Sequence, residues 1–419
     1  MAKKQEKAIS ERVPTKRQLS KWQRQMRIRR IVIIAAVVFL VGIASWVGYG
    51  YYKDYKSDPL RQVVIEVNDV SFTMEYFIEI LDGYTRGMNS TELYYMGDTI
   101  ANDIANDIIK TEVLRQGAKD LGIEVTPEEI EAKLKEAGLS SDEAYRYLAK
   151  SVLLQEKLKE YLGSPLRLPN TMEQAHVQVM LVESQEVADE VIAKVEAGSN
   201  LTDLVAEFSC NSTVKGDLGW LPEELMPNTL IGNAAFNLTP GEISQPIYDA
   251  TATKDVGYWL IEVTDKQDGN INALVMLLGS EAEAEQVKAE LAAGGNFSAL
   301  AGNYSQHQSK TNGGKLSGLK RGDMGSNAFD AVAFNLTVNT VSEPVKDTSV
   351  KTTGGYWLVR VIDRDDRELE EAVRNDLIDK RFNDTLEAWK KHSTIENLLD
   401  AAKRAWAVNQ VLQGRLTLQ

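Results

Sequence analysis

Cysteine and histidine are the residues that this chain most lacks. Among 419 residues the single cysteine is Cys210, so no disulfide can form within the chain and a disulfide-stapled scaffold is excluded. The three histidines, His176, His307 and His392, lie far apart, and there is no HExxH, CxxC or histidine cluster, so we expect no metal site. Walker and GxGxxG motifs are also missing, and we expect no cofactor.

Charge is distributed unevenly along the chain. The formal net charge is −14, yet residues 1–30 hold eleven Lys and Arg against two Glu, so the remainder carries −23. An acidic body argues against nucleic acid as its partner. Residues 1–30 are therefore interpreted as a basic cytoplasmic arm that precedes the globular part of the chain.

One long apolar run follows the basic arm. Residues 31–52 contain 22 residues without a charge, which as a helix would extend roughly 33 Å, about the thickness of a hydrocarbon core. The run is longer than the apolar core of a cleaved signal peptide. It predicts a single transmembrane helix, with the N-terminus in the cytoplasm and the body on the extracytoplasmic face of the inner (cytoplasmic) membrane.

Two helical regions flank the centre of the body. Residues 60–170 begin with a strand pattern at Val63, Ile65 and Val67 and continue as helices, one of them starting at the Thr126-Pro127 cap. Residues 367–419 carry an apolar stripe at helical spacing, which needs a partner surface. We therefore expect these two regions to pack together as one helical domain that is completed by the C-terminal helix.

Residues 171–366 contain the same segment twice. The triplet Val-Met-Leu begins at Val179 and again at Val275, and Gly-Tyr-Trp-Leu begins at Gly257 and again at Gly355. Self-similarity of this length predicts two homologous domains, 171–268 and 269–366. We expect each copy to form its own compact module with elements in the order β-α-β-α-β-β, and the fold class to be α+β.

Several segments of the first copy form a recognisable pattern: Ala175-His176-Val177-Gln178-Val179, Glu207-Phe208-Ser209, Gly216-Asp217-Leu218-Gly219-Trp220, Ala235-Phe236-Asn237-Leu238, Pro240-Gly241-Glu242-Ile243-Ser244 and Gly257-Tyr258-Trp259-Leu260-Ile261. Together they resemble the parvulin-type (PpiC-type) peptidyl-prolyl cis-trans isomerase domain. The region 60–170 is similar to the N-terminal chaperone segment of the SurA/PrsA class of extracytoplasmic foldases. The resemblance covers about residues 60–390.

The resemblance implies a particular chemistry. Rotation of an X-Pro bond has a barrier of about 18–20 kcal/mol and makes or breaks no bond, so an enzyme only needs to bind the twisted imide better than the planar one. The family uses an apolar proline slot, typically a Met and two Phe. Beside the slot lie two His and a Cys or Asp.

Both copies match this site only in part. The polar positions of the first copy are His176, Asn211 and Trp259, and its slot positions are Met226, Leu230 or Ile231, and Phe236. The polar positions of the second copy are Asn272, His307 and Trp357, and its slot positions are Met324, Phe329 and Phe334. Because Trp replaces the second histidine in both copies, the polar cluster is incomplete in each.

Structural readings of the same residues stay open. His176 is either a pocket residue or a satisfied histidine on a strand, and His307 is either a site residue or an exposed residue of a polar loop. Cys210 fits a partly buried small residue as well as a nucleophile. The Met and Phe residues fit core packing as well as substrate contact.

The sequence thus predicts a membrane-anchored extracytoplasmic foldase or chaperone that acts on unfolded or newly exported polypeptides. If it catalyses prolyl isomerisation, we expect the activity in the first copy. The alternative is a catalytically inactive holdase or envelope assembly partner that only binds proline-containing or apolar segments.

Overall fold

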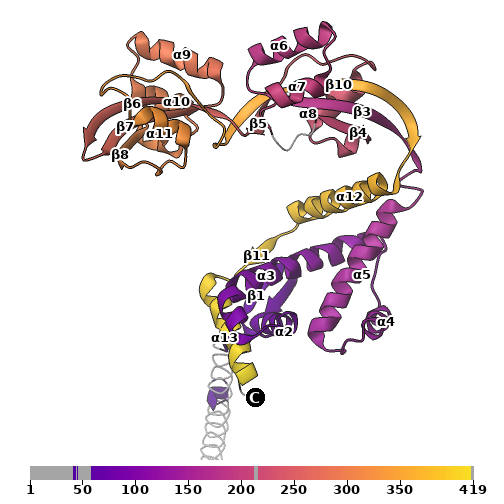
Figure 1. Cartoon of the computed structure of the whole chain (residues 1–419). Coiled ribbons are helices and arrows are strands. Elements are labelled where there is room, and N and C mark those ends of the chain that lie inside the picture. The colour runs from indigo at the N-terminus through magenta and orange to yellow at the C-terminus, as the bar shows by residue number, and fades with distance from the viewer. Residues whose placement is uncertain (1–40, 44, 46–57, 212–215, 417–419) are drawn as a thin grey trace, which may run out of the picture. The chain divides into compact units, whose positions relative to one another are not determined.

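The computed structural model describes residues 41–43, 45, 58–211 and 216–416. The chain forms two compact units (Figure 1). The helical unit comprises Met1–Leu158 and Asn383–Gln419, and the sheet unit comprises Lys159–Phe382. Most of the predicted anchor, 31–52, lies outside the described residues; residues 41–43 and 45 are helical. Within the described part, no helix is both long and apolar enough to cross a membrane.

The helical unit consists of a small sheet surrounded by helices. Its elements are η1 (Pro59–Arg61), β1 (Val63–Val67), β2 (Val70–Thr73), α2 (Met74–Tyr84), α3 (Ser90–Asp120), α4 (Pro127–Ala137), the first part of α5 (Glu143–Gly163), the end of α12 (Glu371–His392), β11 (Ile395–Asn397) and α13 (Ala401–Leu416). The predicted cap of α4 is confirmed, because Glu129 N donates to Thr126 Oγ1 at 3.3 Å and Thr126 N donates to Glu129 Oε2 at 2.8 Å.

The C-terminal segment completes this unit, as the sequence predicts. Strand β11 pairs antiparallel with β1, and Leu398 N donates to Val64 O at 2.9 Å. Helix α13 packs on α3 and α2. At its two ends, Arg404 pairs with Asp98 and Arg415 pairs with Asp82.

The sheet unit contains two four-stranded sheets. The first has the order β4-β3-β10-β5 and the second the order β8-β7-β6-β9. The strands are β3 (Thr171–Val182), β4 (Asp217–Leu221), β5 (Ile247–Lys254), β6 (Gly257–Gln267), β7 (Asn270–Leu278), β8 (Lys315–Leu319), β9 (Val345–Asp347) and β10 (Thr352–Glu368); the helices are α6 (Gln185–Glu196), α7 (Leu201–Phe208), η2 (Glu223–Leu225), α8 (Thr229–Asn237), α9 (Glu281–Ala292), α10 (Phe297–Tyr304), η3 (Gln308–Asn312) and α11 (Asn327–Ala333).

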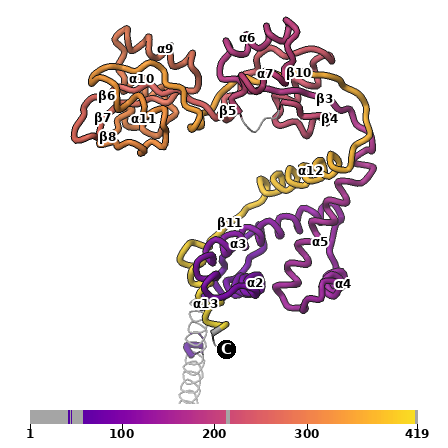
Figure 2. The backbone as a smooth tube through the Cα atoms, viewed as in Figure 1, coloured from indigo at the N-terminus to yellow at the C-terminus, as the bar shows by residue number. Residues whose placement is uncertain are grey.

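The closing strands of the two copies are exchanged. Strand β6 ends the first copy in sequence but lies in the second sheet, where Ile261 faces Val275 of β7. Strand β10 ends the second copy but lies in the first sheet, where Val359 faces Val179 of β3. Figure 1 shows β10, in orange, beside the magenta β3, and Figure 2 follows the same backbone path.

This exchange corrects the expectation of one self-contained sheet per copy for 171–268 and 269–366. Closing the first copy on itself would need a two-residue hairpin of Asp255 and Val256 between β5 and β6. The favoured two-residue hairpin turns need positive φ angles, which a β-branched valine strongly resists. The chain instead runs on from Lys254 into the second sheet.

Helices cover both faces of each sheet. In the first sheet, Val177 and Val179 share a core with Ile231 of α8, whereas Met180 and Val182 on the opposite face pack with α6 and α7. We call these the α8 face and the α6–α7 face. Side chains of β3 alternate between them: Ala175, Val177, Val179 and Leu181 lie on the α8 face, and Met180 and Val182 lie on the α6–α7 face. In the second sheet, the core shared with α11 defines the α11 face.

Candidate slots completed by exchanged tryptophans

The strand exchange moves the two site tryptophans between the copies. Trp357 of the second copy lies in the first sheet, and its indole Nε1 donates to Asp249 Oδ2 at 2.9 Å. Trp259 of the first copy lies in the second sheet, and its Nε1 donates to Asp347 Oδ2 at 2.8 Å. Both tryptophans are buried. The predicted grouping of Trp259 with His176 is therefore wrong, because these residues belong to different sheets.

The two carboxylates that receive the indole hydrogen bonds are themselves buried and well satisfied. Asp249 also accepts from Thr251 N at 2.8 Å, and Asp347 also accepts from Ser349 N at 2.8 Å and from Ser326 Oγ. Burial acts to raise the pKa of each carboxyl, but the hydrogen bonds outweigh it and hold both pKa values below the usual one. Both groups are therefore anionic at neutral pH.

The predicted slot residues of the first copy lie on the α8 face. Met226 and Ile231 are buried in the core that also contains Trp357, and Phe236 packs against this core while half-buried. Leu230 is half-buried and is not part of that core, so Ile231 is the residue beside Met226. Met226, Ile231 and Phe236 thus come together with Trp357 rather than with Trp259.

His176 does not share this face. It alternates along β3 with Ala175 and Val177, which belong to the α8 face, so its side chain lies on the opposite, α6–α7 face. There its Nε2 lies 2.8 Å from Asp217 Oδ1, and its ring packs on Trp220 with centroids 5.8 Å apart. Of the two interpretations of His176 given above, this environment fits the second, a histidine on a strand whose hydrogen bonding is satisfied outside the slot.

Asn272, the counterpart of His176, has a similar position. It alternates with Ile271 and Ala273, which face α11, and its Oδ1 accepts from Gly318 N at 2.8 Å. Neither strand residue reaches the slot of its own sheet.

Cys210 and Asn211 are held by backbone groups. Cys210 Sγ donates to Leu181 O at 3.1 Å, and burial raises the pKa of this thiol to about 12. Such a thiol carries almost no thiolate near neutral pH, so Cys210 is a poor nucleophile. Asn211 Nδ2 donates to Thr253 O at 2.8 Å.

In the second sheet, all three predicted slot residues and one predicted polar residue lie around the tryptophan. The ring of Trp259 makes edge contacts with Phe329 and His307, at centroid distances of 5.3 Å and 5.4 Å. Met324 and Phe334 are half-buried and pack against the same core. His307 is thus half-buried beside the slot rather than an exposed residue of a polar loop.

His307 has a defined hydrogen-bonding state. Its Nδ1 lies 2.8 Å from Ser309 Oγ and accepts from Ser309 N at 3.3 Å, which assigns the ring proton to Nε2. Burial lowers the pKa of this imidazole. The ring is therefore neutral at pH 7 and can offer one Nε2–H donor.

Sequence reasoning missed Asp249 and Asp347. The signal was present, because Asp-Ala-Thr at 249–251 and Asp-Thr-Ser at 347–349 are separated by 98 residues, the same offset as Trp259 and Trp357. Each copy thus supplies a carboxylate followed two residues later by a hydroxyl. Only the fold reveals that each carboxylate meets the other copy's tryptophan.

Comparisons with known protein families agree with this architecture. Residues 173–265 and 279–363 match the PPIC-type PPIASE domain, and residues 19–165 match the SurA-like N-terminal domain. These matches place a SurA-like N-terminal domain before two PPIC-type domains in this chain. Each parvulin match includes most of its own copy's closing strand, which in the structure lies in the other sheet.

The similar curated proteins are chaperones and foldases. The chain is 26% identical over 300 residues to Chaperone SurA of Dechloromonas aromatica, covering 65% of this chain and 64% of that protein. It is 32% identical over 145 residues to Foldase protein PrsA 3 of Bacillus anthracis, covering 33% of this chain and 49% of that protein. These matches span from about half to just under two thirds of the relatives' own length.

Solved structures of PrsA align with most of the chain. The crystal structure of PrsA from Bacillus subtilis covers 84% of this chain and 93% of its own, at 15% identity and a TM-score of 0.21. That of foldase protein PrsA from Streptococcus pneumoniae covers 83% and 96%, at 10% identity and a TM-score of 0.26.

Proposed function

We propose that this protein is an extracytoplasmic foldase that binds unfolded or newly exported polypeptides and isomerises X-Pro bonds weakly. The observation that carries the proposal is the pair of apolar clusters at the predicted slots, in each of which a methionine and a phenylalanine pack with a tryptophan fixed on a buried carboxylate. The related chaperones and foldases support the same reading.

We also propose that residues 31–52 anchor the protein in the cytoplasmic membrane. The uncharged run and the basic arm before it support a cytoplasmic N-terminus and an extracytoplasmic body. This placement would hold the slots near chains that emerge unfolded from export.

Of the two slots, we propose that the slot of the second sheet is the isomerase site. His176, the reason for favouring the first copy, lies on the far face of its sheet, whereas His307 contacts Trp259 in the second slot. A neutral Nε2–H can donate a hydrogen bond to the imide as it twists. It cannot supply the charge that a carboxylate or thiolate provides, so we expect slow turnover.

A protease-coupled assay on a proline-containing peptide tests this proposal with residues 53–419. We expect His307→Ala to lower kcat/KM about tenfold, since removing a positioned hydrogen-bond donor typically costs at least that much. The matched change Asn211→Ala should leave the rate unchanged. Equal losses in both variants, or none in either, would contradict the assignment.

The alternative is a holdase without useful catalysis, which the missing second histidine favours in both copies. Suppression of aggregation of an unfolded client separates the two. A holdase protects the client at full strength in His307→Ala and shows no proline turnover in any variant. The foldase proposal requires measurable turnover by the unaltered protein.

A further inference from the structure

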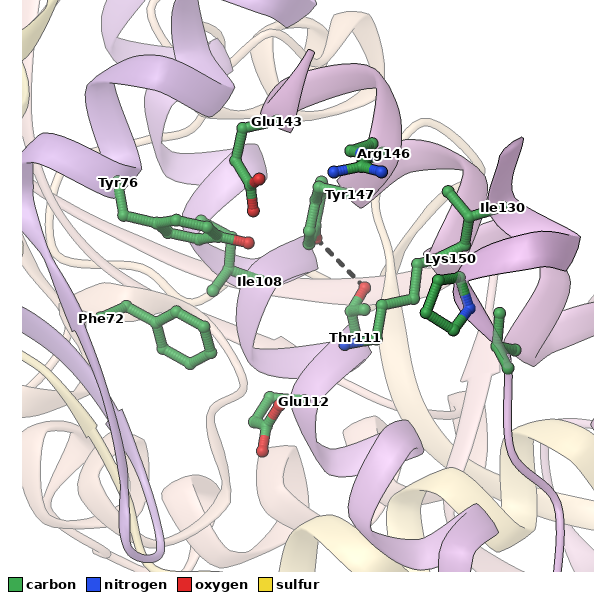
Figure 3. A pocket seen from close by; sticks show the side chains of 12 residues that line it. Phe72, Tyr76, Ile108, Thr111, Glu112, Ile130, Glu143, Arg146, Tyr147 and Lys150 are labelled. Carbon is green, nitrogen blue, oxygen red and sulfur yellow. Dashed lines mark hydrogen bonds between the residues drawn. The ribbon is translucent and has the colours of Figure 1, made fainter. Parts of the chain in front are cut away.

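The helical unit contains a cavity of about 350 Å³ that none of the slot chemistry uses. It lies between β2 and α2 on one side, α3 below, and α4 and α5 on the other side (Figure 3). Its lining is Phe72, Tyr76, Ile108, Thr111, Glu112, Val125, Pro127, Ile130, Glu143, Arg146, Tyr147 and Lys150. The volume falls at the lower end of small-ligand pockets and suits one or two side chains.

The hydroxyl groups of Thr111 and Tyr147 in the cavity wall are held by hydrogen bonds within the protein. Thr111 Oγ1 lies 3.1 Å from the Tyr147 hydroxyl and 2.9 Å from Ser151 Oγ, and the Tyr147 hydroxyl donates to Asp107 Oδ2 at 2.8 Å. Figure 3 shows the bond between Thr111 and Tyr147 near the centre of the cavity. These groups therefore fix the positions of α3 and α5 and leave a preformed wall.

Two of the four charged groups in the lining are committed elsewhere. Glu112 accepts two bonds from Arg115, at 2.6 Å and 2.8 Å, and one from Gln116 at 2.7 Å. Arg146 pairs with Glu131.

The side chains of the other two charged residues, Lys150 and Glu143, make no hydrogen bond or ion pair with any described residue. Lys150 is half-buried, and burial is the main cause that lowers the pKa of its ammonium group. Glu112 and Glu143 attract this ammonium and Arg115 repels it, but no described carboxylate lies within hydrogen-bond reach. A carboxylate of a ligand would supply a charge-assisted hydrogen bond in place of the water that burial removes.

The rest of the cavity wall is apolar or aromatic. Phe72 contacts Tyr76 with ring centroids 5.3 Å apart, and Tyr76 makes an edge contact with Tyr147 at 6.4 Å. Ile108 and Ile130 add aliphatic surface from α3 and α4. This wall suits an apolar side chain beside the charge of Lys150.

We propose that this cavity binds a polypeptide segment that presents a carboxylate to Lys150 and an adjacent apolar side chain to Phe72, Ile108 and Ile130. Glu143 accepts a backbone N–H of the bound segment. That the ligand is a polypeptide rests on the proposed foldase function. The carboxylate comes either from an Asp or Glu side chain or from the C-terminus of a client, and both sources offer the same chemistry.

The test measures binding of fluorescent peptides to the full chain. Four peptides share one apolar core: a free-acid form, its C-terminal amide, an amide with Glu beside the core, and an amide with Gln in its place. We expect the free acid, the Glu peptide or both to bind at least about tenfold tighter than their neutral counterparts, and the preferred acid identifies the source. Equal affinity for acidic and neutral peptides would overturn the proposal.

Variants of two lysines tie the preference to the cavity. Lys150→Met should remove the preference for acidic peptides, and Lys150→Arg should retain most of it. Lys135→Met, an exposed lysine on α4 outside the cavity, should change nothing. An acid preference that survives in Lys150→Met overturns the proposal, and a Lys150→Met chain that fails to fold leaves the peptide comparison in the unaltered protein decisive.

The outcome is separable from the proposed foldase function. If clients are protected and proline turnover is measurable but acidic and neutral peptides bind equally, only the cavity proposal fails. If no client is protected and no turnover is measured, the foldase function fails, whichever peptides bind.

Discussion

Trp259 and Trp357, which the sequence predicts in place of the family's second histidine, are each held by one hydrogen bond. Their indoles donate to Asp347 and Asp249, two buried carboxylates. A buried carboxylate that loses a hydrogen-bond donor still carries the free-energy cost of its desolvation. We therefore expect these two bonds to contribute more to stability than hydrogen bonds between neutral groups.

Replacing either tryptophan by phenylalanine tests this view. We expect Trp259→Phe and Trp357→Phe each to lower the free energy of unfolding by about 1–3 kcal/mol, because each leaves a buried carboxylate with one donor fewer. Trp220→Phe, which keeps a ring for His176 and Arg367, should cost less. Urea unfolding followed by circular dichroism measures all three, and a larger loss for Trp220→Phe would contradict the account.

The same carboxylates make stability depend on pH. Both have folded-state pKa values below the ordinary value of 3.8, so their contribution to stability is complete above about pH 4 and is lost as the pH falls through the folded-state values. We therefore expect the urea midpoint of the sheet unit to fall below pH 4. The double variant Asp249→Asn and Asp347→Asn keeps an acceptor at each site and should show a shallower fall; an unchanged slope would speak against this assignment.

At the scale of elements, close packing of α3 on the C-terminal segment depends on a glycine. A Cβ built at Gly117 would lie 2.2 Å from Trp389 Cδ2, whereas one at Gly302 in α10 meets nothing within 4 Å. Both glycines are inside helices, where alanine is intrinsically favoured by about 1 kcal/mol.

This contrast gives a matched pair of substitutions. Gly302→Ala should stabilise its helix by about 0.5–1 kcal/mol. Gly117→Ala should instead destabilise the helical unit by about 1–3 kcal/mol, because Trp389 must move. Hydrogen exchange of α3 and α10 reports each unit separately, and faster exchange of α3 only in Gly117→Ala is the expected result. Similar protection of α3 and α10 in both variants would show that Trp389 can move without a measurable loss of stability.

Some of these elements and contacts could be predicted from the sequence, and others could not. The Thr126 cap, the repeat and the joining of the two terminal regions follow local chemistry or amphipathic pattern, and the structure has all three. The face on which His176 lies could not be predicted, because strict alternation on β3 permits either face to carry the slot. Asp249 and Asp347 lie on edge strands whose partners the sequence does not specify.

At the scale of the whole molecule, the exchange of β6 and β10 makes the two copies one folding unit. Both closing strands begin Gly-Tyr-Trp-Leu, so their hydrophobic pattern fits either sheet and cannot reveal which one they join. Each slot consequently contains residues from both copies. A change in one copy's closing strand should therefore alter the other copy's slot.

The exchange itself is the central claim, and a disulfide test addresses it most directly. In the sheet unit Glu173 on β3 faces Asp366 on β10, and both are exposed. Directly opposed residues of antiparallel strands have Cα atoms roughly 4.5–5.5 Å apart, within reach of a disulfide. Asp268 holds the repeat position of Asp366 and would face Glu173 if the first copy closed on itself.

The measurement is mild oxidation of two double-cysteine variants in a Cys210→Ser background, followed by peptide mass spectrometry. The account predicts a 173–366 disulfide in Glu173→Cys with Asp366→Cys, and none in Glu173→Cys with Asp268→Cys. A 173–268 disulfide without the 173–366 one would show that each copy closes on itself, and the shared slots described above would not exist.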